Sequence, residues 1–124
     1  MTTKWCFDID GVITANPQAL SWLTYHLCKN ENNNYIYLLS WRDGTDATRK
    51  IQTISDLQKF NVHYNELIMA PKRFGNIRQA AFWKIAQIHK LGIKIWFDDE
   101  LKSYKRDYKI NVDALLPDVV KIWI

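Results

Sequence analysis

The chain has 124 residues and a formal net charge of +4, with 48% hydrophobic, 24% charged and 14% aromatic residues. This composition excludes an intrinsically disordered chain. No apolar run reaches the roughly 18 residues that a membrane-spanning helix needs, so we expect no membrane insertion. The length predicts a single domain over residues 1–124.

The positive charge is concentrated in the second half of the sequence. Residues 63–124 contain eleven Lys and Arg against seven Asp and Glu, whereas residues 1–62 contain six of each. A basic surface favours a polyanionic partner such as nucleic acid, through contacts with its phosphates. Lysines that serve only solubility explain the charge equally well.

The cysteines and the N-terminal residues indicate a reducing compartment. Cys6 lies in an apolar stretch and Cys28 in an expected helix, so both are expected to be isolated, reduced thiols. Residues 1–4 lead directly into that apolar stretch and lack the apolar core of a signal peptide. The expected location is the cytoplasm.

Strands and helices are expected to alternate along the chain, because short apolar runs alternate with stretches of helical periodicity. The first half predicts a strand over 4–7, a helix from Asn16 with an apolar stripe at Leu20, Leu23 and Leu27, a polar loop over 29–34, a strand over 35–39 and a helix over 47–60. The second half predicts a strand over 67–70, a basic loop over 71–75, a helix from Asn76 to Gly92, a strand over 93–97, a short helix over 101–108 and extended stretches over 112–116 and 119–123.

This alternation predicts an α/β fold, a Rossmann-like three-layer sandwich with a mainly parallel central sheet and helices on both faces. Ligands of such sheets bind beyond the carboxyl ends of the strands. Polar side chains follow each of the first four expected strands. In chain order they are Asp8 and Asp10, then Ser40, then the basic residues Lys72, Arg73 and Arg78, then Asp98 and Asp99.

This set of side chains suggests phosphoryl transfer. Asp8, Asp10 and Asp98 are hard oxygen ligands suited to Mg²⁺ rather than zinc. The Ser40 hydroxyl can donate to a phosphoryl oxygen, and a cation after the third strand can neutralise charge that develops on the transferring group. An isolated Asp-x-Asp is more often a polar turn. The functional interpretation is preferred only because polar side chains follow all four of the expected strands.

The sequence resembles the haloacid dehalogenase superfamily of phosphotransferases. The Asp-x-Asp-Gly-(Thr/Val) motif of that family is matched by residues 8–12, and Ser40 and the pair Asp98-Asp99 match its hydroxyl and acidic motifs. The resemblance implies that Asp8 is the nucleophile and that Asp10 is the general acid and then the base. It also implies that Mg²⁺ is held by Asp8, the Asp10 backbone carbonyl and Asp98, with Asp99 either behind these ligands or as an alternate ligand.

Three basic residues compete for the cationic position that the resemblance implies. Arg78 is preferred because it lies at a helix start about twenty positions before Asp98, which suits the layout of the family. Lys72 is next, and Lys84 lies further inside the helix.

The expected substrate contacts are Trp41, Arg42 and Lys72. Trp41 stands where relatives often have glycine. It could stack on a nucleobase, although local packing is the favoured interpretation.

The intervals between the motifs have no room for the cap domain that encloses small substrates in relatives, so we expect an open site. Residues 67–69 and 77–84, followed by 93–99, resemble the 3′-phosphatase domain of phage-type polynucleotide kinase-phosphatases. The expected function is a Mg²⁺-dependent phosphomonoester hydrolase that acts on a nucleotide or a nucleic-acid terminus. The alternatives are a small-metabolite phosphatase and a non-catalytic module that binds Mg²⁺ and nucleic acid.

Overall fold

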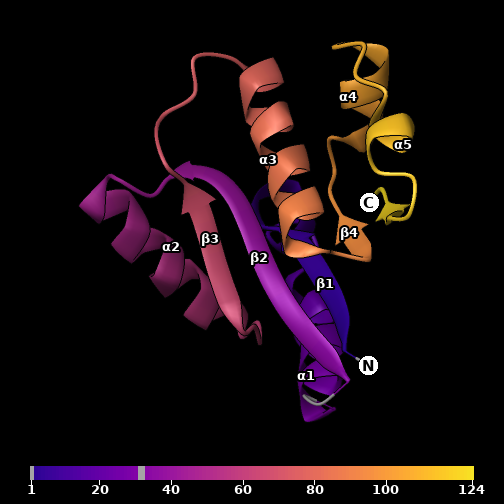
Figure 1. Ribbon diagram of the computed structural model, residues 1–124. Helices are drawn as coiled ribbons and strands as arrows, with labels where there is room; N and C mark the ends of the chain where they lie inside the picture. The colour runs from indigo at the N-terminus through magenta and orange to yellow at the C-terminus, as the bar shows by residue number, and fades with distance from the viewer. Residues whose placement is uncertain (1, 31–32) are drawn as a thin grey trace.

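The computed structural model describes residues 2–30 and 33–124 and contains a parallel five-stranded sheet in the order β3-β2-β1-β4-β5 (Figure 1). The strands are β1 (Thr3–Asp8), β2 (Asn34–Asp43), β3 (Glu66–Ala70), β4 (Ile95–Phe97) and β5 (Val120–Ile122). The helices are α1 (Pro17–Lys29), α2 (Ala47–Phe60), α3 (Ile77–Leu91), α4 (Leu101–Arg106) and α5 (Val112–Leu115), and an irregular helical turn, η1 (Ile9–Ile13), follows β1.

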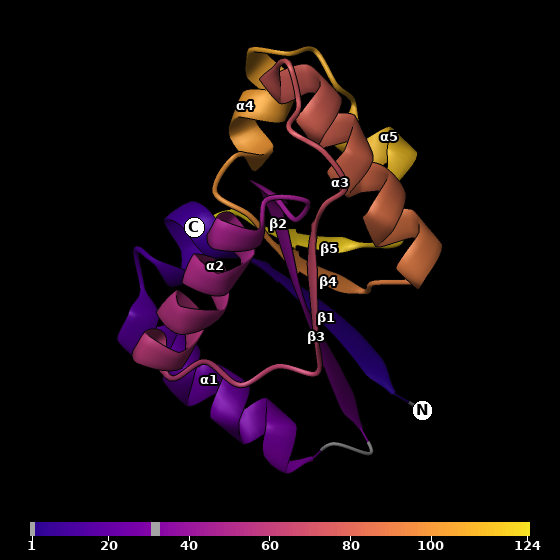
Figure 2. The same cartoon turned by 90° about the vertical axis from the view of Figure 1, so that its left-hand side faces the viewer.

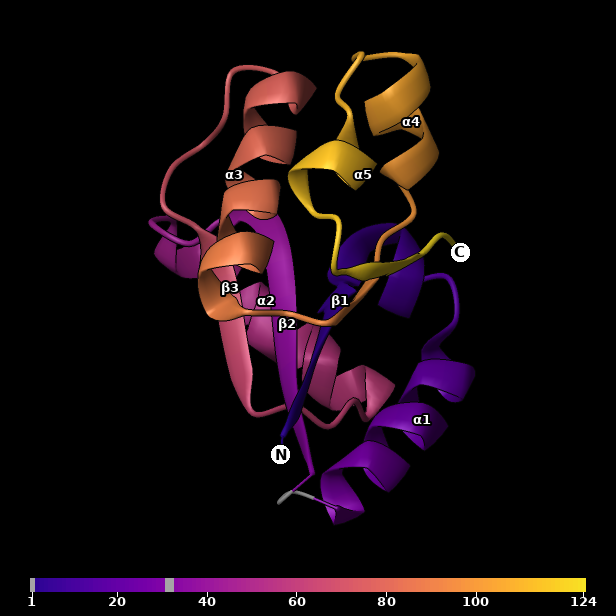
Figure 3. The same cartoon turned by 45° about the vertical axis from the view of Figure 1, so that its right-hand side comes forward.

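Helices cover both faces of the sheet, which confirms the predicted three-layer α/β fold. Figure 2 shows α1 and α2 on one side of the sheet and α3 and α5 on the other. Figure 3 shows α4 and α5 beside α3. Between β1 and β2 the described residues form only η1 and α1, and between β2 and α3 only α2 and β3, so neither interval contains a cap domain.

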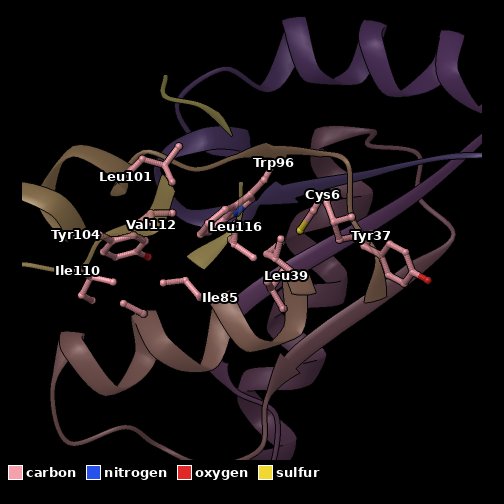
Figure 4. Packing of buried hydrophobic residues seen from close by; sticks show 13 residues of the cluster. Cys6, Tyr37, Leu39, Ile85, Trp96, Leu101, Tyr104, Ile110, Val112 and Leu116 are labelled. Atoms are coloured by element: carbon pink, nitrogen blue, oxygen red, sulfur yellow. The ribbon is translucent and has the colours of Figure 1, made fainter. Parts of the chain in front are cut away.

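Two apolar clusters fill the layers, and the sheet separates them. Cys6 packs in the cluster beneath α3, whereas its neighbour Phe7 packs in the cluster beneath α1 and α2. Trp96 and Phe97 of β4 divide in the same way. Figure 4 shows the first cluster, in which side chains of β1, β2 and β4 meet those of α3, α4 and α5. Burial on both faces explains why these strands read as continuous apolar runs in the sequence.

Most predicted elements are present, with differences in the tail. The expected extended stretch over 112–116 is wrong, because residues 112–115 form the helix α5. The Asn111 side chain accepts a hydrogen bond from the Ala114 backbone N–H at 3.1 Å and caps this turn. Val112 and Leu116, four residues apart, are both buried, as expected for one side of a helix.

Two further expectations concern loops and thiols. The predicted polar loop over 29–34 includes Glu31 and Asn32, which lie outside the described residues. Cys6 is a free, buried cysteine, and Cys28 is half-buried. Within the described ranges, none of the helices combines the length and the apolar character needed to cross a membrane.

Candidate active site

Three carboxylates gather at the carboxyl ends of β1 and β4. Asp8 is the last residue of β1, and Asp98 follows β4, the strand that pairs with β1 through Trp5 to Phe7. Asp99 is the next residue along. Oxygen atoms of Asp8, Asp98 and Asp99 all lie within 4.8 Å of one another. Asp8 and Asp98 are buried, and Asp99 is half-buried.

A buried lysine from α3 completes this cluster. The Lys84 ammonium lies 3.0 Å from Asp8 Oδ1 and 3.2 Å from Asp98 Oδ2, and its side chain has no exposed surface. A buried ammonium is stable only when it is paired with opposite charge, and two carboxylates supply that pairing here. Burial lowers the pKa of Lys84, but Asp8 and Asp98 more than reverse this and hold its pKa above the ordinary value. Lys84 is therefore a cation at neutral pH.

One lysine does not balance three carboxylates. Burial raises the pKa of Asp8 far above its usual value, against the lowering effect of Lys84, and Asp98 raises it further. Burial and then Asp98 raise the pKa of Asp99 in the same way. The cluster therefore has an excess of negative charge, and a cation or a proton relieves it.

Local contacts fix the orientation of each carboxylate. Asp98 Oδ1 accepts a hydrogen bond from the Glu100 backbone N–H at 2.8 Å, and Asp98 Oδ2 accepts one from the Tyr104 hydroxyl at 3.5 Å. Asp99 lies directly against Gly11, where a Cβ atom would come within 1.9 Å of Asp99 Oδ2. Gly11 also has a φ of +86°, so both its conformation and its missing side chain are needed at this turn.

Asp10 lies outside the three-carboxylate cluster and is held by Arg42. The Arg42 Nε and Nη2 atoms donate to the two oxygens of Asp10 at 2.9 and 2.6 Å, a bidentate pair. Arg42 Nη1 also donates to Thr53 Oγ1 at 3.1 Å and to Asp56 Oδ2 at 3.3 Å, both on α2. The hydrogen bonds from Arg42 lower the pKa of Asp10. Arg42, expected to contact substrate, is buried and committed to these partners.

The two residues after Ser40 lie on opposite faces of the sheet, as successive residues of a strand do. The pairing of β2 with β3 is regular up to Ser40 and resumes at Asp43, so Trp41 and Arg42 lie at an irregularity in this pairing. Arg42 reaches α2, whereas the Trp41 ring lies 5.0 Å from the Lys84 ammonium of α3. The buried Ser40 Oγ accepts a hydrogen bond from the Arg42 backbone N–H at 3.1 Å, which leaves its own hydrogen to donate.

The structure brings Lys84, and not the preferred Arg78, to the carboxylates. Arg78 is exposed on the first turn of α3, where its guanidinium donates to the Tyr108 backbone carbonyl and lies 5.1 Å from the Phe82 ring. Lys72 is exposed in the basic loop, with its ammonium 5.8 Å from the Phe74 ring.

The sequence carried a signal for Lys84 but not for Tyr104. Lys84 lies three residues after Ala81 and four before Ile88, on the buried stripe of α3, and a lysine on such a stripe indicates a buried partner. Tyr104 is fully buried on α4, and its hydroxyl reaches Asp98 from a short helix whose packing no motif indicates.

The residues present fit a divalent cation. Mg²⁺ is bound in proteins by one or two carboxylates together with water and substrate oxygens. Asp8, Asp98 and Asp99 supply converging carboxylate oxygens with surplus negative charge, at a strand edge where ligands of parallel sheets bind. Arg42 binds the carboxylate of Asp10, whereas the Asp10 backbone carbonyl, which the resemblance placed among the Mg²⁺ ligands, stays a predicted ligand.

Comparison with solved structures finds one chain of the same fold. It belongs to a structure described as the Pnkp1/Rnl/Hen1 RNA repair complex, and the superposition has a TM-score of 0.65 at 14% sequence identity. The superposition covers 99% of the present chain and 42% of the matched chain, so the present chain spans less than half the length of the matched one. No protein-family model matches the sequence, and a search of curated proteins finds no match.

Proposed function

We propose that this chain is a Mg²⁺-dependent phosphomonoester hydrolase that forms an aspartyl-phosphate on Asp8. The observation that carries the proposal is the placement of the Lys84 ammonium between Asp8 and Asp98, beside a three-carboxylate cluster at the carboxyl ends of parallel strands. A site that only binds anions does not require a buried carboxylate among its negative charges. A site in which a phosphoryl group is transferred to Asp8 does require this carboxylate, as the nucleophile, and Lys84 can neutralise the charge that the phosphoryl group brings.

The proposed reaction has two steps. An Asp8 carboxylate oxygen attacks phosphorus, the bond to the ester oxygen breaks, and Asp10 gives that oxygen a proton. Water then attacks the phosphorus of the acyl phosphate, Asp10 takes the proton of the water, and the bond to Asp8 breaks to release inorganic phosphate. Lys84 and the Ser40 hydroxyl would stabilise the phosphoryl oxygens in both steps.

Asp8, Asp98 and Asp99 are the residues that would hold Mg²⁺. When bound, the ion would supply positive charge to phosphoryl oxygens and offset the repulsion among the carboxylates. The donor set supports this proposal, because it contains only hard oxygen ligands.

A nucleic-acid end is the proposed substrate. The site has no cap in the described intervals, so it is open to the end of a long molecule. The basic residues Lys72 and Arg73 are exposed in the loop before α3, and the net charge is positive. The likeness of fold to a chain of an RNA repair complex is consistent with this substrate class.

The test is release of inorganic phosphate from a 3′-phosphorylated oligonucleotide, with and without Mg²⁺. We expect release only with the metal, and we expect Asp8→Asn to abolish it because a carboxamide is nearly isosteric but a poor nucleophile. Asp113→Asn, a change in an exposed surface carboxylate, is the matched control and should retain activity. A folded wild-type protein that releases phosphate from no phosphomonoester would overturn the proposal.

The pair between Arg42 and Asp10 favours a second candidate, a non-catalytic module that binds Mg²⁺ and nucleic acid. Arg42 stabilises Asp10 as a carboxylate, whereas a general acid must carry a proton before it can donate one. Beryllium fluoride, a phosphoryl analogue, separates the two candidates. A crystal structure with beryllium fluoride bound to Asp8 would support the hydrolase. A structure at saturating Mg²⁺ and beryllium fluoride with no adduct on Asp8 would favour the module.

A further inference from the structure

An aromatic pocket adjoins the candidate active site on the α3 side of the sheet. Its volume is about 290 Å³, and it is lined by Trp41, Arg73, Phe74, Asn76, Ile77 and Ala80. Trp41 and Phe74 are half-buried, so part of each ring remains accessible. The volume lies at the small end of the range for ligand sites, which suits one nucleoside rather than a larger group.

Trp41 connects this pocket to the site. It directly follows Ser40, and its ring lies 5.0 Å from the Lys84 ammonium, which is itself 3.0 Å from Asp8. Ala80, on the pocket wall, is one helical turn before Lys84 on α3. A group in the pocket would therefore be next to a phosphate held by Lys84.

The charges at the pocket rim suit the backbone of a nucleic acid. Arg73 lines the pocket, and Lys72 lies over the Phe74 ring, so two cations of the exposed loop stand at the aromatic wall. Asp43 is an acidic residue that interacts electrostatically with Arg73 of this loop. Aromatic rings beside exposed cations are the combination by which proteins bind unpaired bases and their phosphates.

We propose that this pocket binds the unpaired terminal base of a single-stranded nucleic acid, with Trp41 as the stacking surface. This inference rests on the proposed function for the position of the phosphate but is carried by a different set of residues. The terminal base lies against Trp41 and Phe74, its 3′-phosphate reaches Lys84 and Asp8, and Lys72 and Arg73 contact the phosphates that precede it.

The experiment measures binding rather than turnover. All proteins carry Asp8→Asn, and the probe is a 5′-labelled single-stranded pentanucleotide with a 3′-phosphate, compared with the same probe lacking its terminal base. Fluorescence anisotropy gives the dissociation constants. We expect loss of the base to weaken binding about tenfold, as stacking on one aromatic ring implies. Trp41→Leu should weaken binding of the complete probe about tenfold and leave the base-free probe unchanged.

Two further variants test whether a change in folding, rather than loss of stacking, explains weaker binding. Phe74→Leu, in the loop away from Lys84, should weaken binding of the complete probe about fivefold. Trp22→Leu replaces a tryptophan that is 65% exposed on α1, on the other face of the sheet, and should change neither constant. Equal binding of the two probes, equal weakening of both by Trp41→Leu, or tighter binding of a phosphotyrosine peptide would each overturn the inference.

The two proposals fail separately. If binding depends on the base and on Trp41, but the protein with Asp8 intact releases no phosphate, the pocket proposal stands and the hydrolase proposal fails. If both probes release phosphate with equal kcat/KM and bind equally well, the hydrolase proposal stands and the pocket proposal fails.

Discussion

Lys84 is the residue whose chemistry most constrains the site. Its ammonium lies between two carboxylates at the ends of different strands, at 3.0 and 3.2 Å, and its side chain is fully buried on the inner stripe of α3. A lysine kept in such a place for stability alone is unusual, because the cost of removing the ions from water is comparable with their attraction. The same arrangement is useful where a phosphoryl group must be received.

Replacing Lys84 by methionine should therefore destabilise the metal-free protein. Lys84→Met keeps the volume of the side chain but leaves Asp8 and Asp98 buried without their cation, and we expect a loss of about 3 kcal/mol in the free energy of unfolding. Urea denaturation measures it. Lys105→Met removes an exposed ion pair with Asp113 and should change the free energy by less than about 0.5 kcal/mol. Equal effects of the two variants would contradict this account of Lys84.

Asp10 is predicted to act on the leaving group. The oxygen of a sugar hydroxyl leaves poorly without a proton, whereas p-nitrophenolate leaves without one. Asp10→Asn should lower kcat/KM about 10²-fold or more for an oligonucleotide 3′-phosphate and much less for p-nitrophenyl phosphate, since kcat/KM reports formation of the aspartyl-phosphate. Steady-state release of phosphate measures both. An equal loss on the two substrates would instead indicate that Asp10, with Arg42, only supports the structure of the site.

Gly11 is expected to position Asp99. Gly11→Ala adds a Cβ that would come within 1.9 Å of Asp99 Oδ2, at a residue with φ of +86°. We expect a loss of about 1–3 kcal/mol in stability, and weaker Mg²⁺ binding because Asp99 must move. Gly75→Ala is the matched control, because the nearest atom to its Cβ is the flexible Gln79 Oε1 at 3.6 Å. Thermal unfolding with and without Mg²⁺ measures both effects, and a Gly11→Ala protein indistinguishable from Gly75→Ala would refute the expectation.

At the scale of elements, the spacing of apolar residues predicted the buried strands and the buried side of the long helix α3. The apolar runs of β1 to β4 and the inner stripe of α3 are visible in the sequence because burial selects residue types at fixed spacing. The orientation of a single charged side chain is not visible in the sequence, since it depends on which neighbours the tertiary structure supplies. Arg78 was preferred over Lys84 on its position in the sequence alone, and Arg42 was expected to contact substrate although the structure pairs it with Asp10.

The tail shows the same limit for short elements. A helix of four residues such as α5 has too little periodicity to distinguish it from a strand, and the Asn111 cap is the one local signal for it. In contrast, α3 has fifteen residues, an Asn cap and a glycine in the left-handed conformation at its end, so both ends were predictable.

The cap of α3 should contribute to the stability of the element that carries Lys84. Asn76 Oδ1 accepts a hydrogen bond from the Gln79 backbone N–H at 2.9 Å. Asn76→Ala should lower the free energy of unfolding by about 1 kcal/mol, whereas Asn76→Asp retains the acceptor and adds a favourable charge at the helix N-terminus. Urea denaturation compares the variants, and equal loss in both would show that the cap is not the source of the effect.

At the scale of the whole molecule, the parallel sheet makes the site by collecting the ends of strands that are distant in sequence. Asp8 and Asp98 are ninety residues apart, yet β1 and β4 are direct neighbours in the sheet. Both are buried, and Lys84 of α3 bonds to both, so an interaction at this point links β1, β4 and α3. A ligand that binds here should therefore stabilise the folded chain as a unit.

Mg²⁺ should thus raise the melting temperature. The carboxylates repel one another in the metal-free protein, and an ion that binds only the folded state stabilises it by about 2.7 kcal/mol at a hundredfold excess over its Kd. Differential scanning calorimetry against Mg²⁺ concentration measures the rise. Asp98→Asn should reduce it strongly, while Asp113→Asn, a change in an exposed carboxylate on α5, should preserve it. If the melting temperature rises equally in all three proteins, the ion binds elsewhere and the three carboxylates are not its ligands.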